Sequence, residues 1–175
     1  MNGNRLPVSI THYYNSCDSD KDEFGMGYGW RTSLHQALHK VLYNGEVEFV
    51  YTDGDGTEHF FKKNDSDQKK HSDQSGLSLT LEIGDENITI TDKGDNVMTF
   101  PLVSDTPTED APETGKALIQ KIQDAVGNEV TVTALADSPL KIASVTDGAG
   151  RVTTLHYTDG RCDRIQTPWQ DENSC

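Results

Sequence analysis

The stretch from residue 142 to residue 165 reads IASVTDGAGRVTTLHYTDGRCDRI and alternates apolar with polar side chains around two turn signals. The signals are Asp147-Gly148 and Asp159-Gly160, and Asp-Gly pairs favour the positive φ angles of tight hairpins. The stretch therefore predicts strand, turn, strand, turn, strand. Val152 is out of step with Leu155 and Tyr157 in the middle strand, so we expect an irregularity or bulge there.

Three Asp-centred turns upstream resemble the turn at Asp147. They lie in segments 49–60, 88–100 and 119–132, and the common form is apolar-x-Asp-x-x-Gly-polar-x-apolar, which the copy at 88–100 follows more loosely. The last two copies are offset by 147 − 124 = 23 residues, and regular repeats of about 20–50 residues indicate stacked arrays. In such a turn Asp bonds backbone N–H groups and Gly takes the left-handed position. The predicted turn residues are Asp53, Gly56, Asp92, Asp124, Gly127, Asn128, Asp147, Gly150, Arg151, Tyr157, Gly160 and Arg161.

The rest of the chain is also mostly strand-like. Residues 46–51 and 77–83 alternate, and Asn44-Gly45 is a strong hairpin signal. Residues 30–43 fit a helical stripe slightly better by local pattern, although the hairpin at Asn44 requires residues 38–43 to be extended. Residues 62–76 contain no apolar side chain and predict an exposed loop.

An acidic, proline-containing connector at residues 104–114 divides the chain. We expect an irregular β region over residues 1–103 and hairpin repeats over residues 115–175. Together they predict an all-β protein, with antiparallel hairpins stacked in a curved or spiralling sheet of repeat type.

Composition excludes some classes of function. The 175 residues include 29 acidic and 15 basic side chains, for a net charge of −14, which argues against binding nucleic acid. No run approaches the ~18 apolar residues of a membrane span, and no signal peptide is evident. The three cysteines, Cys17, Cys162 and Cys175, are widely spaced, which favours incidental thiols over a zinc site or a disulfide framework.

Few residues suggest chemistry. The acidic segment 18–29 lacks the glycine and glutamate of a calcium loop. Asp53-Gly-Asp55-Gly56 could help to ligate Ca²⁺, but a hairpin turn is the favoured interpretation. His35 and His39 are four residues apart with no third ligand evident, and no G-x-S-x-G motif is present. We therefore expect no enzyme activity and no cofactor.

Aromatic residues follow three glycines spaced two apart in the segment GMGYGW, residues 25–30. If this segment is a strand, Met26, Tyr28 and Trp30 share one face. Tyr14, Tyr28 and Trp30 could stack on a sugar ring, although aromatic residues at this spacing are more often sheet core. Trp169 would fall in the next strand or loop.

Apolar-x-Asp-x-x-Gly-[Arg/Asn], a strand, and then Tyr-x-x-Gly-Arg-x-x-x-Ile together resemble the RHS or YD repeat. The matching residues are Val145, Asp147, Gly150, Arg151, Tyr157, Gly160, Arg161 and Ile165. The upstream segments 14–16, 27–30 and 53–61 also resemble what precedes such repeats, so the similarity runs from about Val8 to the end. One departure is that Thr158 splits the family's Tyr-Asp pair.

The resemblance implies a large bacterial protein that is secreted or displayed on the cell surface, including the cell wall. Its repeats would build a spiralling β-shell around a toxic C-terminal effector, and this chain would be an early, non-enzymatic section of the shell. Its main partner would then be the rest of its own longer chain. The alternative is a carbohydrate-binding or adhesin module that contacts cell-surface glycans. The family's strands over residues 30–38 also override the local helix preference.

Overall fold

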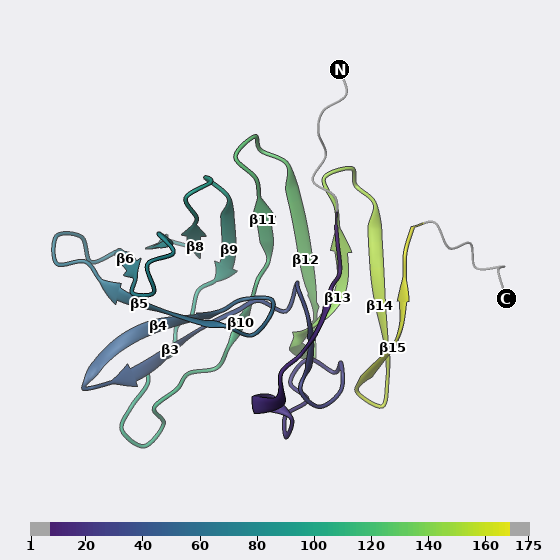
Figure 1. Ribbon diagram of the computed structural model, residues 1–175, viewed down its shortest axis with the longest axis horizontal. Coiled ribbons are helices and arrows are strands. Elements are labelled where there is room, and N and C mark those ends of the chain that lie inside the picture. The colour runs from purple at the N-terminus through teal and green to yellow at the C-terminus, as the bar shows by residue number, and fades with distance from the viewer. Residues whose placement is uncertain (1–7, 169–175) are drawn as a thin grey trace, which may run out of the picture.

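The computed structural model describes residues 8–168 and contains two antiparallel β-sheets (Figure 1). The all-β prediction is confirmed; the described helical element is a single short 3-10 turn, η1 (Ser16–Asp18). The small sheet pairs β1 (His12–Tyr14) with β2 (Trp30–Thr32). The large sheet contains β3 (Ala37–Tyr43), β4 (Glu46–Thr52), β5 (Glu58–Lys63), β6 (Lys70–Asp73), β7 (Thr80–Ile83), β8 (Asn87–Thr91), β9 (Val97–Pro101), β10 (Ala117–Leu118), β11 (Lys121–Gln123), β12 (Glu129–Leu135), β13 (Ser138–Thr146), β14 (Val152–Thr158) and β15 (Arg161–Gln166).

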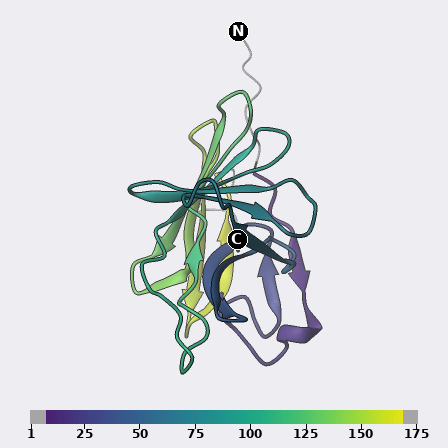
Figure 2. The ribbon, with the colours of Figure 1, turned by 90° about the vertical axis from the view of Figure 1, so that its left-hand side faces the viewer.

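The large sheet is one continuous meander with a single exception in its strand order. β3 to β9 follow one another in space, and β11 to β15 continue from β9. The exception is β10, which pairs with β3, while β11 a few residues later pairs with β9. Residues 117–123 therefore connect the two ends of the β3–β9 meander, and the sheet curves back on itself (Figure 2).

One face of this curved sheet carries the hydrophobic core. Alternate residues of each strand point to the same face, and the core side chains Phe61, Leu81, Ile90 and Phe100 are fully buried. Core residues come from both halves of the meander, because Val145 and Leu155 belong to the same cluster. Hydrophobic burial on one face therefore joins the early strands to the late hairpins.

The local helix preference for residues 30–43 is wrong. β3 pairs with β4 along its whole length, from Ala37 opposite Thr52 to Tyr43 opposite Glu46, across the Asn44-Gly45 turn. Leu38 faces the main core, while Ala37 and His39 point to the other face and are buried as well. A strand that is buried on both faces loses its period-two pattern, which explains why the sequence looked helical.

Residues 62–76 are not simply an exposed loop, as predicted, because they contain the end of β5 and all of β6. His71 in β6 is buried, with its ring 5.1 Å from that of Phe49 in an edge-to-face contact. The interior side chain of this short strand is thus a histidine. The alternation of apolar residues that indicates a strand is therefore absent from β6.

The glycine-rich segment is a series of turns rather than a strand. Gly25, Gly27 and Gly29 have φ angles of 68°, 103° and 73°, which side chains rarely adopt. Met26, Tyr28 and Trp30 therefore do not share a strand face. Gly29 is also required for close packing, since an added Cβ would lie 2.8 Å from the Asn15 carbonyl oxygen.

The connector at residues 104–114 is a loop that returns to the free side of β3. The Leu42 N–H donates to the Pro112 carbonyl, and the Thr114 N–H donates to the Lys40 carbonyl. β9 and β11, which precede and follow this loop in the sequence, pair directly with each other. The sheet therefore continues across the boundary predicted between residues 103 and 115.

The irregularity expected at Val152 lies elsewhere. Val152 keeps regular register with Thr146, and it is 45% exposed on the outer face. The register shift falls between His156 and Tyr157, where β14 pairs with β15. Asp147-Gly148 is also not a tight turn with positive φ; in this hairpin the positive φ belongs to Gly150.

Candidate functional site

Four aspartate-capped turns share one geometry, and a fifth is a variant of it. In the turns at Asp53, Asp92, Asp124 and Asp147, the Oδ1 atom accepts the backbone N–H groups of the residues two and four positions later, at 2.7 to 3.1 Å. The fifth turn begins at Asp73, whose two carboxylate oxygens accept the N–H groups two and four positions later at 2.9 and 2.8 Å. These bonds satisfy amide groups that the turn leaves without a ladder partner.

The backbone of the four predicted turns is also the same. The aspartate N–H donates to the carbonyl four residues later, and the N–H three residues later donates to the aspartate carbonyl. The residue at that third position has positive φ: 98° at Gly56, 59° at Asp95, 88° at Gly127 and 77° at Gly150. This is a type I turn followed by a left-handed bulge residue, a common three-residue hairpin loop.

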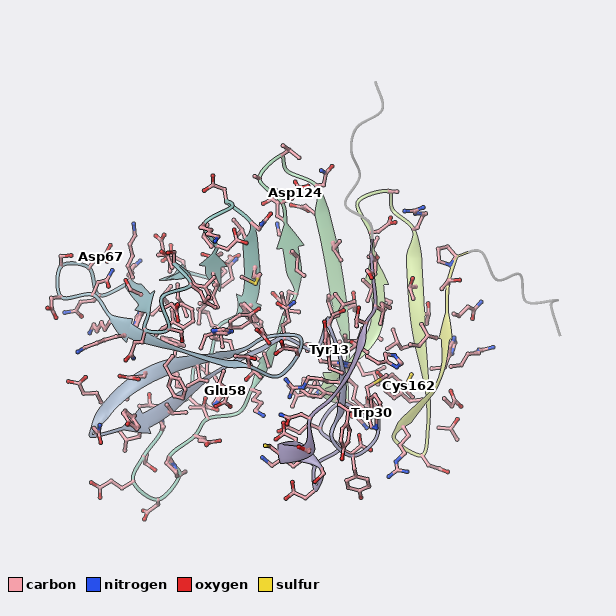
Figure 3. All side chains as sticks on the ribbon, viewed as in Figure 1. Tyr13, Trp30, Glu58, Asp67, Asp124 and Cys162 are labelled. Atoms are coloured by element: carbon pink, nitrogen blue, oxygen red, sulfur yellow. The ribbon has the colours of Figure 1, made fainter. Side chains whose placement is uncertain are left out.

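All five turns lie at the same end of the strands, along one rim of the sheet. In an antiparallel meander every second turn falls at the same edge, and the strand pairings place the turns at Asp53, Asp73, Asp92, Asp124 and Asp147 there. We call this row of five turns the aspartate edge. Figure 1 shows its last three turns at the top of the view, and Figure 3 labels Asp124 among them. Their spacings are 20, 19, 32 and 23 residues, and the 32-residue interval contains the connector.

The fourth residue after the aspartate often bonds its second carboxylate oxygen. Asn96 and Asn128 donate through Nδ2 to Asp92 and Asp124 at 2.8 and 2.7 Å. Arg151 donates through Nε to Asp147 at 2.6 Å. These side-chain bonds, with the backbone N–H bonds, stabilise the carboxylate form. They hold the pKa of Asp124 and of Asp147 below its usual value.

The remaining turn residues lie at the opposite edge. Asp159 and Gly160 have φ angles of 50° and 80°, as a two-residue type I′ hairpin requires. The Gly160 carbonyl accepts a hydrogen bond of 2.7 Å from Lys141 Nζ, and Tyr157 donates its hydroxyl to the Ile142 carbonyl at 3.0 Å. Burial raises the pKa of Tyr157 to about 12.

Residues 8–36 form a compact unit, the N-terminal module, which contains β1, η1 and β2 and leads into β3. Its centre is Arg31, which is 5% exposed. The Arg31 guanidinium lies 4.9 Å from the Phe24 ring centroid and 4.0 Å from the Asp18 carboxylate. It also donates a hydrogen bond of 3.4 Å to the Asp53 carbonyl. Gly54 lies against Ser33, where an added Cβ would be 2.4 Å from the carbonyl oxygen. The module is thus packed against the first turn of the aspartate edge.

The same module also reaches the last hairpin. The Cys162 N–H on the outer side of β15 donates to the Gly25 carbonyl at 2.6 Å. Arg161 lies 3.3 Å from the Asp22 carboxylate, and its guanidinium lies 5.2 Å from the Tyr28 ring centroid. The loop at residues 22–28 thus covers part of the sheet's free edge.

The aromatic candidates for glycan binding are on the surface. Tyr14 is 54% exposed, Tyr28 55% and Trp30 44%, so the expectation that they form sheet core is wrong. Tyr14 and Trp30 form a pair with ring centroids 5.2 Å apart. Figure 3 labels Trp30 and Tyr13 on the module. Tyr28 lies beside Arg161 instead.

The metal and thiol candidates have ordinary local roles. Within residues 8–168 no group of three His, Cys, Asp or Glu side chains could hold a metal ion. The Asp53 and Asp55 carboxylates are occupied by turn N–H groups. Cys17 is exposed and Cys162 is partly buried, and both are free thiols. Cys175 and Trp169 lie outside the described residues.

Comparison with known families matches the N-terminal third of the chain. A family model described as a domain of unknown function (DUF6531) matches residues 1–61. The described part of this match contains the N-terminal module and continues through β3 and β4 into β5. No curated protein matches the chain. In residues 8–168 none of the helical structure is long and apolar enough to cross a membrane.

Proposed function

We propose that this chain is a non-enzymatic structural segment of a large secreted or cell-surface bacterial RHS/YD-repeat protein. It builds part of a β-shell that encloses or presents a C-terminal effector. The observation that supports this most is the aspartate edge: five turns of one chemistry at the same edge of a continuous sheet. Each turn, together with the turn at the opposite edge, adds one hairpin.

The addition is open-ended in physical terms. An aspartate that satisfies its own turn amides needs no partner outside the hairpin, so each hairpin is locally complete at the aspartate edge. The apolar face of each strand then packs on the common core, as Val130, Val145 and Leu155 do. Such a unit is stabilised by its neighbours along the array, as in other repeat proteins.

Protease protection of the full-length gene product tests this function. We expect the region C-terminal to the repeats to resist trypsin while the sheet is intact, and to be cut once the sheet is unfolded in denaturant. The same C-terminal region, expressed alone, should be cut without denaturant. Equal cleavage rates for this region in the intact protein and alone would contradict an enclosing shell.

A second candidate is binding of surface carbohydrate by the N-terminal module. The exposed Tyr14–Trp30 pair supports it, because aromatic faces with an exposed polar tip suit sugar rings. Calorimetric titration of glycans should show binding that Trp30→Ala abolishes and Tyr43→Ala preserves. Tyr43 is a matched control because it is also exposed, at 57%, but lies at the far end of β3. An equal loss in both variants would argue against the module.

A further inference from the structure

Four histidines are buried in the described part of the chain with a ring nitrogen that has no hydrogen-bond partner. They are His35, His39, His59 and His71, all less than 5% exposed, with unpaired Nε2 in His35 and unpaired Nδ1 in the other three. His59 and His71 lie in the strands β5 and β6. His35 closes the turn of residues 32–35, whose Ser33 lies against Gly54 and whose Leu34 belongs to the main core, so its protonation state bears on the docking of the module.

The hydrogen bonds of His35 require a neutral ring. Its Nδ1 accepts the Thr32 backbone N–H at 3.0 Å and lies 2.9 Å from the Thr32 hydroxyl. A backbone N–H can only donate, so a proton on Nδ1 would set two donors against each other. The neutral ring therefore carries its proton on Nε2, the atom without a partner.

The surroundings of His35 also disfavour a cation. Its ring is fully buried, and the Phe24 ring packs on it with centroids 4.6 Å apart. The charged and titratable groups that act on it are Arg31 of β2 and His12 of β1; Arg31 itself faces Asp18 at 4.0 Å. Burial, then Arg31 and His12, lower the pKa of His35 to about 3.

His39 in β3 has a pKa shifted in the same direction. Burial and then Lys116 lower its pKa, while Glu113, Glu58 and Glu23 oppose this shift. Lys116 forms a 2.8 Å ion pair with Glu23 of the module. The net effect is a pKa of His39 below its usual value, with burial as the largest cause.

From this arrangement we propose that His35 is a pH-sensitive latch that holds the N-terminal module on the sheet at neutral pH and releases it in mild acid. Release opens the turn of residues 32–35, so the ring is hydrated, its nitrogens are free of the Thr32 N–H, and it titrates near 6.5. Protons therefore bind the open state more readily than the closed state. The open-to-closed ratio rises about fivefold over the first pH unit below 6.5, and about tenfold for each further unit until the closed state also titrates.

Release would change what the molecule presents. Opening breaks the contact of Arg31 with the Asp53 turn and the bond from Cys162 to Gly25. The outer side of β15 is then free to pair with another strand. The module would also move away from the first turn of the aspartate edge.

Hydrogen exchange at pH 7.5, 6.5 and 5.5, corrected for intrinsic rates, tests the latch. The opening equilibrium of amides in residues 9–36 should rise about fivefold from pH 6.5 to pH 5.5, while amides of β7 and β8 stay protected. This comparison within the wild-type chain separates release of the module from global unfolding. Module amides that open no more than β7 and β8 do would overturn the proposal.

The variant His35→Asn sharpens the test, because Asn Oδ1 can accept the Thr32 N–H but does not titrate. We expect it to remove most of the fivefold rise. The control His156→Asn, at a partly exposed histidine that contacts Gln166, should behave as wild type. A wild-type slope in His35→Asn would assign the effect to other groups and overturn the role of His35. If His35→Asn does not fold, the wild-type comparison still decides.

Discussion

The Asp22 carboxylate lies 3.3 Å from the Arg161 guanidinium and joins two parts of the chain that are 139 residues apart. Asp22 belongs to the N-terminal module and Arg161 begins the last strand of the sheet. The backbone bond from Cys162 to Gly25 runs beside this pair. The contact holds the N-terminal module against the last hairpin. A substitution in either partner should therefore change the local stability of the other.

The first prediction concerns this contact. Asp22→Asn and Arg161→Gln should each change global stability by about 0.5 kcal/mol or less, because Arg161 is more than half exposed. Both should nevertheless raise hydrogen exchange of the Cys162 amide several-fold. The double variant should match either single variant. Additive effects of the two substitutions on that amide would show that the residues do not act through each other.

The turn aspartates should be worth more than their exposure suggests. Asp147→Ala removes the acceptor of two backbone N–H groups and of the Arg151 side chain. We therefore expect a loss of about 1–2 kcal/mol in the free energy of unfolding, as at helix caps. Asp163→Ala, at the exposed residue that contacts the Thr158 hydroxyl, is the control and should cost less than about 0.5 kcal/mol. Urea unfolding measures both, and equal losses would refute the capping role.

Close packing of the module on the Asp53 turn can be tested with one methyl group. Gly54→Ala places Cβ 2.4 Å from the Ser33 carbonyl oxygen, whereas Gly115→Ala meets nothing within 4 Å. We expect Gly54→Ala to destabilise by about 1–3 kcal/mol, and Gly115→Ala to be neutral or slightly stabilising. If Gly54→Ala were neutral in thermal unfolding, the module would not be seated against this turn.

Acid should weaken the aspartate edge. Burial tends to raise the pKa of Asp92, but bonds from Asn96 and Gly94 outweigh it, and the pKa lies below its usual value, as at Asp124 and Asp147. A carboxyl whose pKa is lower in the folded state than in the unfolded state stabilises the fold. This stabilisation is complete above the pKa of the unfolded state, near 4, and is lost as the pH falls through the pKa of the folded state. Denaturant titrations from pH 5 to pH 2 should show this decline. In Asp147→Asn the decline should be shallower, and an unchanged slope would contradict the assignment.

The sequence predicts the regular part of this molecule well. Asp124, Asp147 and their partners Asn128 and Arg151 carry their turn geometry locally, because the side chain bonds amides two and four residues away. Asn44-Gly45 and Asp159-Gly160 specify tight hairpins in the same local way. Such features depend on a few adjacent residues and are readable without tertiary context.

The missed features depend on contacts that are distant in sequence. The sequence of β3 resembles a helical stripe because Ala37 and His39 on its second face are buried as well as Leu38. The sequence around β6 predicts a loop because the interior residue of this strand is His71. The turn at Asp73 carries the same Asp-x-x-Gly signal as the turns at Asp53, Asp124 and Asp147, at Asp73-Gln-Ser-Gly76, and its spacing from Asp53 and Asp92 also indicates it. The exposure of Trp30 followed from the positive φ angles of the glycines beside it.

Electron cryomicroscopy of the full-length gene product tests the central claim most directly. We expect the sheet to continue beyond β15 through further hairpins whose aspartate-capped turns extend the same edge, and to surround the C-terminal region. A sheet that stops at β15, with the following residues folded as a separate domain beside it, would contradict the shell.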